Sequence, residues 1–230
     1  GTFTLEPQLE DVHTNIEAAV AKITQHAKKM HTARSRNDQV CLDTRLYMRD
    51  AINEISQAIL LLQRSLSQVA KNDCVFPSYT HTQVAQPVSL SFWAHAHWQG
   101  FERDLQRLSQ LYGRVNQNPL GSGAVAGTAW PIDRDYTSKL LGFDSPTANP
   151  MDSVSNRGEL ETELLSTLYT AMSHASRIAE DCILLSSKRL IILPDEYSTG
   201  SSMMPQKKNP DPLELIRGKT SRMLGLYVHA

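Results

Sequence analysis

The 230-residue chain is long enough to bury a substantial hydrophobic core, either as one large domain or as two small ones. Its 23 basic and 24 acidic residues leave a formal net charge of -1, so no global field favours nucleic acid or an anionic membrane as a partner. The charge balance favours a small molecule or a second copy of the chain as the partner. No apolar run approaches the roughly 20 residues of a membrane span, so we expect a soluble protein, and the cysteine pattern described below favours the cytoplasm.

The first part of the chain predicts long helices. It contains neither glycine nor proline between Pro7 and Pro77, whereas strands of ordinary length would need turns. We expect one helix over about residues 9–29 and another over about residues 39–71, where apolar residues alternate steps of four and three. That apolar seam consists of Met48, Ile52, Ile55, Ile59, Leu62, Leu66 and Val69.

Two further apolar seams predict two more long helices. The first begins after Pro87 and ends near Gly113, the second ends before Pro194, and a last helix begins near Pro212. The seam residues are Ala94, Trp98, Phe101, Leu105, Leu108 and Tyr112, followed by Leu160, Leu164, Leu168, Ala171, Ala175, Ile178, Cys182 and Leu185. Helices of about 30 residues far exceed the globular mean of about 11 to 12 and favour an all-α bundle of long helices.

The connecting segments differ from the helices in composition. Residues 119–130 are rich in small side chains, residues 147–155 contain a proline, and residues 193–212 contain four, so we expect loops there. The cysteines are odd in number, widely spaced and outside any zinc-ligand pattern, which favours reduced thiols.

Residues 200–210 read GSSMMPQKKNP and combine two serines, two lysines and an asparagine just ahead of the last expected helix. A helix N-terminus with lysines in front of it suits an anion, because its dipole and free N–H groups add to the ammonium charge. By composition alone, an exposed and solvated loop fits equally well.

This segment resembles the signature of the fumarase/aspartase superfamily, and PQKKNP is similar to its argininosuccinate lyase branch. The resemblance continues in the family's order through HTARSRNDQV at 31–40, YTH at 79–81 with QPV at 86–88, LGSGAVAG at 120–127 and LELIRGK at 213–219. Family members are much longer, so we expect a fragment. Residues 1–36 would end an N-terminal helical domain, residues 37–230 would form the central bundle, and the C-terminal domain would be absent.

The resemblance implies a C–N lyase of arginine biosynthesis, which splits argininosuccinate into arginine and fumarate by β-elimination with neither a metal nor an organic cofactor. It implies Ser201 as the base that removes a proton and Lys207 as the cation that stabilises the resulting dianion. It also implies a pair of His81 with Glu214, which would raise the histidine pKa and let it serve the departing guanidinium. Without the resemblance, a lone histidine in a loop is more often structural or solvated.

Substrate binding and assembly are also implied by the family. Its substrate-binding positions correspond to Arg36, Asn37, Thr80 and Asn209. Asn37 and His81 stand at opposite ends of an expected helix of about 45 Å, so they cannot line one site within one chain. The family forms a homotetramer whose sites combine loops from different subunits, and we expect the isolated fragment to be inactive.

The sequence departs from the family at a few positions. Ala33 replaces the glycine of HTGRSRND, and an alanine is strained if that position needs a positive φ. Asn156 and Gly158 replace acidic residues on either side of Arg157. Two alternatives therefore remain: a sister lyase for another N-succinyl substrate, and a catalytically silent structural paralogue of the kind found among lens crystallins.

Overall fold

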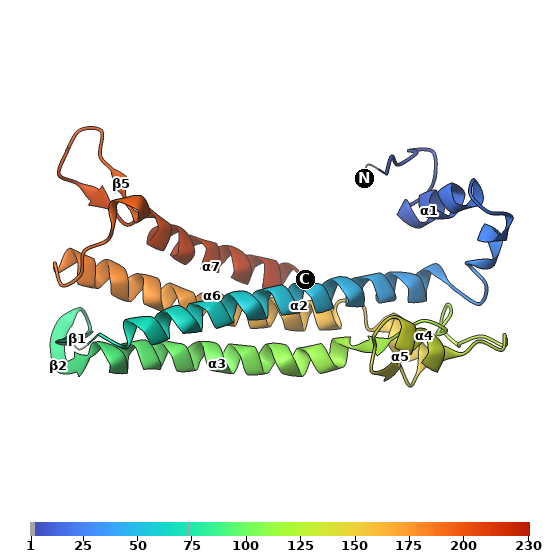
Figure 1. The fold of residues 1–230 in the computed structure, drawn as a ribbon, viewed down its shortest axis with the longest axis horizontal. Coiled ribbons are helices and arrows are strands. Elements are labelled where there is room, and N and C mark those ends of the chain that lie inside the picture. Colours follow the sequence, from blue (N-terminus) through green and yellow to red (C-terminus); the bar gives the residue numbers. More distant parts are fainter. Residues whose placement is uncertain (1–2, 73) are drawn as a thin grey trace. The chain divides into compact units, whose positions relative to one another are not determined.

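The computed structural model describes residues 3–72 and 74–230, which divide into two compact units (Figure 1). Unit 1 combines the chain up to Arg45 with Gln117–Asn156, and unit 2 combines Leu46–Asn116 with Arg157–Ala230. The long helix α2 (Arg36–Val69) begins in unit 1 and continues into unit 2. The predicted domain boundary at residue 36 stays a prediction.

Unit 2 is a bundle of long helices, as the sequence predicted. The greater part of α2 shares one core with α3 (Leu90–Val115) and α6 (Glu159–Ser187), and α6 packs against both α3 and α7 (Asp211–His229) (Figure 1). The buried core consists of Met48, Ile52, Ile59, Leu66, Phe101, Leu108, Leu111, Val115, Leu160 and Leu164. Eight of these ten residues come from the three predicted seams, which confirms the seams.

The end of α3 lies close to the predicted one. We expected the helix to end near Gly113, and α3 continues to Val115, with both Leu111 and Val115 fully buried. No atom lies within 4 Å of where a Cβ on Gly113 would be. This glycine is therefore an ordinary helical residue on an open face, and packing of its neighbours overrides its weak helix propensity.

Unit 2 also contains strands that the sequence did not predict. Strands β1 (Val75–Thr80) and β2 (Gln83–Ser89) form an antiparallel hairpin, in which Pro77 lies opposite Pro87. Prolines inside both segments exclude a helix, and a hairpin keeps the chain extended between α2 and α3. The two-residue strands β5 (Thr199–Gly200) and β6 (Lys208–Asn209) pair further along the chain, after the 3₁₀ turn η2 (Asp195–Tyr197).

Unit 1 is built from shorter elements. They are α1 (Val12–Ala21), the 3₁₀ helix η1 (Gln25–Lys29), the start of α2, β3 (Gln117–Asn118), α4 (Arg134–Leu140), β4 (Ser145–Pro146) and α5 (Pro150–Ser155), with β3 and β4 parallel. As predicted, residues 119–130 contain no helix or strand. No helix in the described part of the chain combines the length and apolarity that a bilayer crossing requires.

Two predictions for unit 1 were wrong. The helix expected over residues 9–29 stops at Ala21, because Thr24 opens a separate turn and its Oγ1 accepts a hydrogen bond from the His26 N–H at 3.3 Å. The loop expected over residues 147–155 contains α5. Asn149 caps that helix by accepting the Asp152 N–H at 3.1 Å, and Pro150 takes the first helical position, where its missing N–H costs nothing.

Candidate active site

The signature loop, residues 200–210, is closed by the pairing of the short strands β5 and β6. Thr199 pairs with Asn209 and Gly200 with Lys208, so the two ends of the loop are held side by side. Within the loop, Ser201 Oγ accepts hydrogen bonds from the backbone N–H groups of Met203 at 3.3 Å and Met204 at 3.2 Å. Two donors aimed at one hydroxyl oxygen favour negative charge on that oxygen, which is what a serine acting as a base requires.

The two lysines of the loop have different surroundings. Lys208 forms an ion pair with Asp195, which neutralises its charge within the chain. Lys207 is exposed, and no ion pair is recorded for it in the described residues. Lys207 is therefore the cation that remains available to an anionic ligand.

The start of α7 follows the loop directly and is less suited to anions than the sequence suggested. Its first turn contains Asp211 and Glu214, whose negative charges oppose the attraction of the helix dipole for an anion. Pro212 has no N–H, and the N–H groups of Leu213 and Glu214 donate to the Pro210 carbonyl at 2.9 and 3.1 Å. An anion at this loop would therefore be attracted by Lys207 rather than by the start of α7, while Asn209, half-buried in β6, supplies an amide.

His81 occupies the tip of the β1–β2 hairpin. It and Thr82 both have positive φ, 53° and 60°, and Thr80 pairs with Gln83 on either side of them. A two-residue turn with these angles is of type I′, which normally selects asparagine and glycine. The turn therefore exposes the imidazole of His81 at the cost of backbone strain, with Thr80 as its exposed neighbour at the end of β1.

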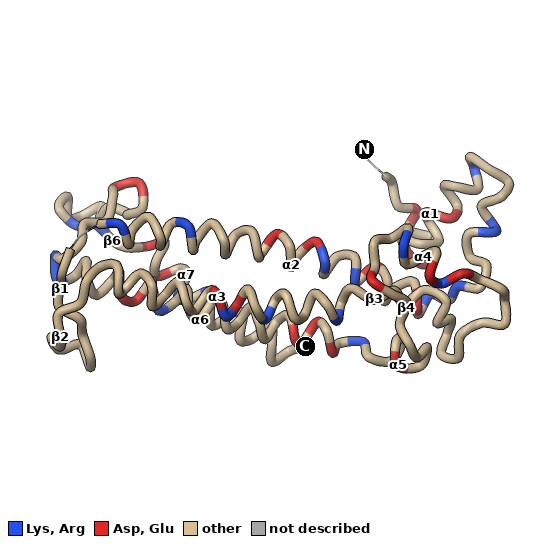
Figure 2. Tube along the Cα trace, turned by 60° about the horizontal axis from the view of Figure 1, so that its bottom comes forward, with Lys and Arg blue, Asp and Glu red and all other residues tan. Residues whose placement is uncertain are grey.

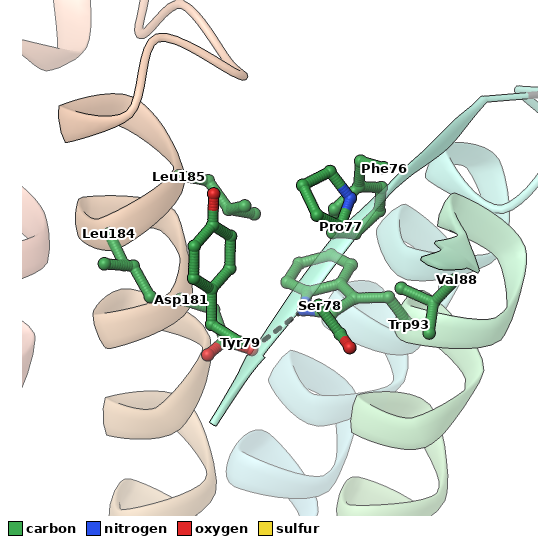
Figure 3. Close-up of a pocket in the computed structure, with 9 residues that line it drawn as sticks. All are labelled: Phe76, Pro77, Ser78, Tyr79, Val88, Trp93, Asp181, Leu184 and Leu185. Carbon is green, nitrogen blue, oxygen red and sulfur yellow. Dashed lines mark hydrogen bonds between the residues drawn. The ribbon is translucent and has the colours of Figure 1, made fainter. Parts of the chain in front are cut away.

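The stem of this hairpin covers a cavity of about 90 Å³ in unit 2 (Figure 3). The cavity is lined by Phe76, Pro77, Ser78, Tyr79, Val88, Trp93, Asp181, Leu184 and Leu185. Asp181 Oδ2 accepts hydrogen bonds from Trp93 Nε1 at 2.8 Å and from His97 Nε2 at 3.0 Å, which joins α6 to α3. Burial acts to raise the pKa of the Asp181 carboxyl, but the hydrogen bonds from His97 and Trp93 outweigh it, so this pKa is lowered.

The signature loop and the tip of the hairpin lie at the same end of unit 2 (Figures 1 and 2). No salt bridge between His81 and Glu214 is recorded among the described residues, and both side chains are exposed. The pairing of these two residues, like the roles of all the predicted site residues, stays a prediction.

Arg36 and Asn37 lie in unit 1, in the first turn of α2. The Arg36 guanidinium forms an ion pair with Asp11 through Nε at 2.8 Å and donates to Gln39 Oε1 at 2.6 Å and Thr14 Oγ1 at 3.3 Å. Arg36 must therefore exchange internal partners before it can hold a substrate carboxylate. Asn37 is exposed.

One residue of this region escaped the sequence analysis. Asp38 has no exposed surface, and its carboxylate accepts backbone N–H groups from Ser35, Gly121 and Gly123. The spacing of Ser35 and Asp38 matches a capping box, a local signal that could have pointed to this residue. The bonds to the glycine-rich segment could not have been predicted locally, because those partners follow more than eighty residues later.

The chain was compared with protein families and with known proteins. A sequence model of the lyase family matches residues 1–225. Argininosuccinate lyase of Acetivibrio thermocellus is 48% identical over 230 residues, which cover 98% of this chain and 50% of that protein. Argininosuccinate lyase of Thermus thermophilus is 47% identical over 235 residues, which cover 99% of this chain and 51% of that protein. The chain thus spans about half the length of the curated relatives it matches.

Solved structures show the same fold. EDDS lyase in complex with formate has a TM-score of 0.89 and 34% identity to this chain. A variant of EDDS lyase with bound fumarate has a TM-score of 0.88 and the same identity. Both comparisons cover 93% of this chain and 44% of the other.

Proposed function

The chain belongs to the lyase family, and from this we propose that the protein cleaves argininosuccinate into arginine and fumarate by β-elimination. The identity to argininosuccinate lyases over nearly all of the chain supports this substrate. The observation that carries the proposal is the signature loop. There, two backbone N–H groups donate to the Ser201 hydroxyl. Lys207 forms no ion pair with the residues that the structure describes.

In the first step, Ser201 acts as its alkoxide: Oγ takes the proton from the carbon next to a substrate carboxylate and becomes the neutral hydroxyl. The electron pair of the broken C–H bond moves into that carboxylate, which becomes a dianion. The ammonium of Lys207 and the amide of Asn209 stabilise the added charge, because they bind the transition state more strongly than the substrate. A serine hydroxyl is a weak base, so the N–H groups of Met203 and Met204 assist by favouring its alkoxide.

In the second step, the C–N bond breaks and its electron pair leaves with the guanidinium nitrogen. The electrons of the dianion form the carbon–carbon double bond of fumarate at the same time. His81 gives the leaving nitrogen a proton, which completes arginine, and Glu214 holds the imidazole in its donating state. Thr80 lies beside His81 at the end of β1 and would bind the substrate next to it.

Arg36 and Asn37 would bind the carboxylates and amide-like groups of the substrate. In this role Arg36 would release Asp11 in exchange for a substrate carboxylate, since guanidinium and carboxylate groups form charge-assisted pairs of matching geometry. Such an exchange lets the same side chain tie α1 to α2 in the free protein and bind substrate in the complex.

We also propose a homotetramer whose sites combine residues from different subunits. Asn37 lies in the first turn of α2, whereas the hairpin carrying His81 follows the last turn of that 34-residue helix. Such a helix is about 50 Å long. A site that uses both side chains would therefore take Asn37 from one subunit and His81 from another.

The test is to supply the full-length protein with argininosuccinate and to measure both products. The proposal predicts arginine and fumarate in equal amounts. Fumarate release from a different N-succinyl compound, with argininosuccinate untouched, would instead make the protein a sister lyase. A folded protein that releases no fumarate from either substrate would be a silent paralogue.

A further inference from the structure

The carboxylate of Asp38 holds two separate segments of unit 1. Its Oδ1 accepts the Ser35 N–H at 2.9 Å, and its Oδ2 accepts the N–H groups of Gly121 at 3.1 Å and Gly123 at 2.9 Å. The residue has no exposed surface. A buried carboxylate with both oxygens bonded to backbone donors is strongly committed to one geometry, because the loss of any bond leaves a buried polar group unsatisfied.

The bond to Ser35 fixes the start of helix α2. Asp38 accepts the Ser35 N–H, which is one half of a capping box, and Ser35 Oγ accepts the Asn37 N–H at 3.2 Å, one residue before the usual partner. Successive helical residues are rotated by about 100°. A fixed direction for the Asp38 side chain therefore also fixes the direction in which Asn37, one position before it, is exposed.

The bonds to Gly121 and Gly123 fix the glycine-rich loop, residues 120–127. Both glycines have positive φ, 86° and 61°, and a Cβ on Gly123 would lie 2.7 Å from the Gly127 carbonyl oxygen. The loop is also held from its carbonyl side, since Arg134 Nε donates to the Leu120 oxygen at 2.8 Å. Asp38 therefore ties the N–H groups of this loop to the first turn of α2, and Arg134 ties one of its carbonyl groups to α4.

The charges around the loop are also coupled. Burial lowers the pKa of the Arg134 guanidinium, while the negative charges of Asp38 and Asp135 act to raise it. Loss of the Asp38 charge would thus remove both the acceptor for the loop N–H groups and a charge that favours protonated Arg134.

We propose that Asp38 is a positioning residue for substrate binding, which sets the orientation of the α2 start and of the Asn37 side chain on it. This inference rests on the proposed function, since it takes Asn37 as a substrate ligand. Asp38 itself is buried and does not touch substrate. Its removal should weaken binding far more than it slows the chemical step, because proton transfer is assigned to residues of unit 2.

The test compares Asp38→Asn with the matched variant Asp104→Asn in the full-length protein. Asp104 is equally buried and is bonded to His174 at 2.6 Å and Arg107 at 2.9 Å, within unit 2. We expect Asp38→Asn to raise KM for argininosuccinate about tenfold or more, the effect of losing one hydrogen bond to a charged group, with kcat changed by less than about threefold. Asp104→Asn should lower thermal stability and leave KM within about twofold of wild type.

A second readout does not depend on activity. Amide hydrogen exchange in the peptide containing Gly121 and Gly123 should accelerate in Asp38→Asn and stay unchanged in Asp104→Asn. A folded Asp38→Asn variant with wild-type KM, or with wild-type exchange in this peptide, would overturn the proposal. If the wild-type protein released no fumarate, the proposed function would fail, and with it the role in binding, while the exchange rates would still decide whether Asp38 holds the loop.

Asp38→Asn could fail to fold because it leaves buried donors unsatisfied. Gly123→Ala then replaces it, since the added Cβ displaces the loop without altering the carboxylate. The same rise in KM would support the proposal, and an unchanged KM in this variant would overturn it.

Discussion

Thr80 pairs directly with Gln83 across the tip of the β1–β2 hairpin, which leaves only His81 and Thr82 to form the turn, both in the left-handed region. Each such residue costs about 1–2 kcal/mol relative to an ordinary backbone conformation. Strain of this kind persists where the surrounding structure enforces it, and it is concentrated at functional sites. Here the strained turn carries the histidine that we assign to proton transfer.

The role of His81 can be separated from the strain of its turn. Asparagine tolerates the left-handed region, so His81→Asn should keep the hairpin but remove the proton donor. We expect kcat to fall by about 10²- to 10⁴-fold, the usual contribution of general acid catalysis, with no loss of thermal stability. Thr82→Gly is the matched control, because it relaxes the same turn and should retain most of the activity. Wild-type kcat in His81→Asn would remove His81 from the mechanism.

Ala33 provides a test of backbone strain in unit 1. Its φ of 55° confirms the strain anticipated for an alanine where the family has glycine. Ala33→Gly should stabilise the protein by about 1 kcal/mol, because the relief of left-handed strain exceeds the entropic cost of glycine. Urea unfolding measures this change.

The control for Ala33→Gly is the same substitution at a position with ordinary helical geometry. Ala58 is exposed within α2, and Ala58→Gly should destabilise the protein by about 1 kcal/mol. Two changes of the same sign at Ala33 and Ala58 would contradict the interpretation of Ala33 as strained.

The adjacent lysines of the signature loop should differ sharply in importance. Lys207 has no ion-pair partner in the described part of the chain, so its charge is available to the substrate. Lys207→Met should therefore lower kcat/KM by about 10²- to 10³-fold. Lys208→Met removes a cation already paired with the exposed Asp195, so activity should change only a few-fold. Steady-state kinetics of both variants decide the matter. Equal losses of kcat/KM in the two variants would contradict the distinction drawn between the unpaired Lys207 and the paired Lys208.

The cysteines should differ in reactivity. Burial, together with the nearby Asp181 charge, raises the pKa of the Cys182 thiol to about 11, so at about pH 8 it remains a neutral, poorly nucleophilic thiol. Cys74 is exposed. We expect an alkylating reagent to modify Cys74 in the folded protein and Cys182 only after denaturation, as mass spectrometry of the labelled peptides would show. Early labelling of Cys182 would mean that its surroundings open readily.

Shared active sites can be tested by mixing subunits. Ser201→Ala and Asn37→Ala should each be inactive alone. Mixtures refolded together should recover part of the activity, because some sites would then combine the intact Ser201 of one subunit with the intact Asn37 of another. If the mixtures stay as inactive as the separate variants while mixed oligomers form, each site is built within one subunit.

The long helices of unit 2 could be predicted because their cause is local. Apolar residues at steps of three and four, such as Met48, Ile52 and Ile59 in α2, identify the buried face of a helix directly. Helix ends were less predictable. The residues around Gly113 contain no signal that distinguishes a glycine inside a helix from one that ends it. The start of helix α5 did have a local signal. An asparagine followed by a proline, here Asn149 and Pro150, is typical of a helix start, whereas we interpreted Pro150 as a sign of a loop.

The candidate site depended on a different kind of information. Ser201, Lys207 and His81 were identified by resemblance to a family, because no local pattern distinguishes them from solvated loop residues. The type I′ turn at His81 lacks the Asn-Gly signal that normally predicts it, so the hairpin was missed. Asp38 was missed because its glycine partners lie far along the chain and meet it only through the fold of unit 1.

The most direct test of the proposed lyase measures fumarate absorbance when argininosuccinate is added to the full-length wild-type protein and to Ser201→Ala side by side. We predict steady fumarate release from the wild type. The variant should unfold at the same temperature, because this loop hydroxyl contributes little to the core, but should lose at least about 10³-fold in kcat, as expected when a catalytic base is removed. Fumarate release by a folded Ser201→Ala variant at the wild-type rate, or none from the wild type itself, would contradict this account.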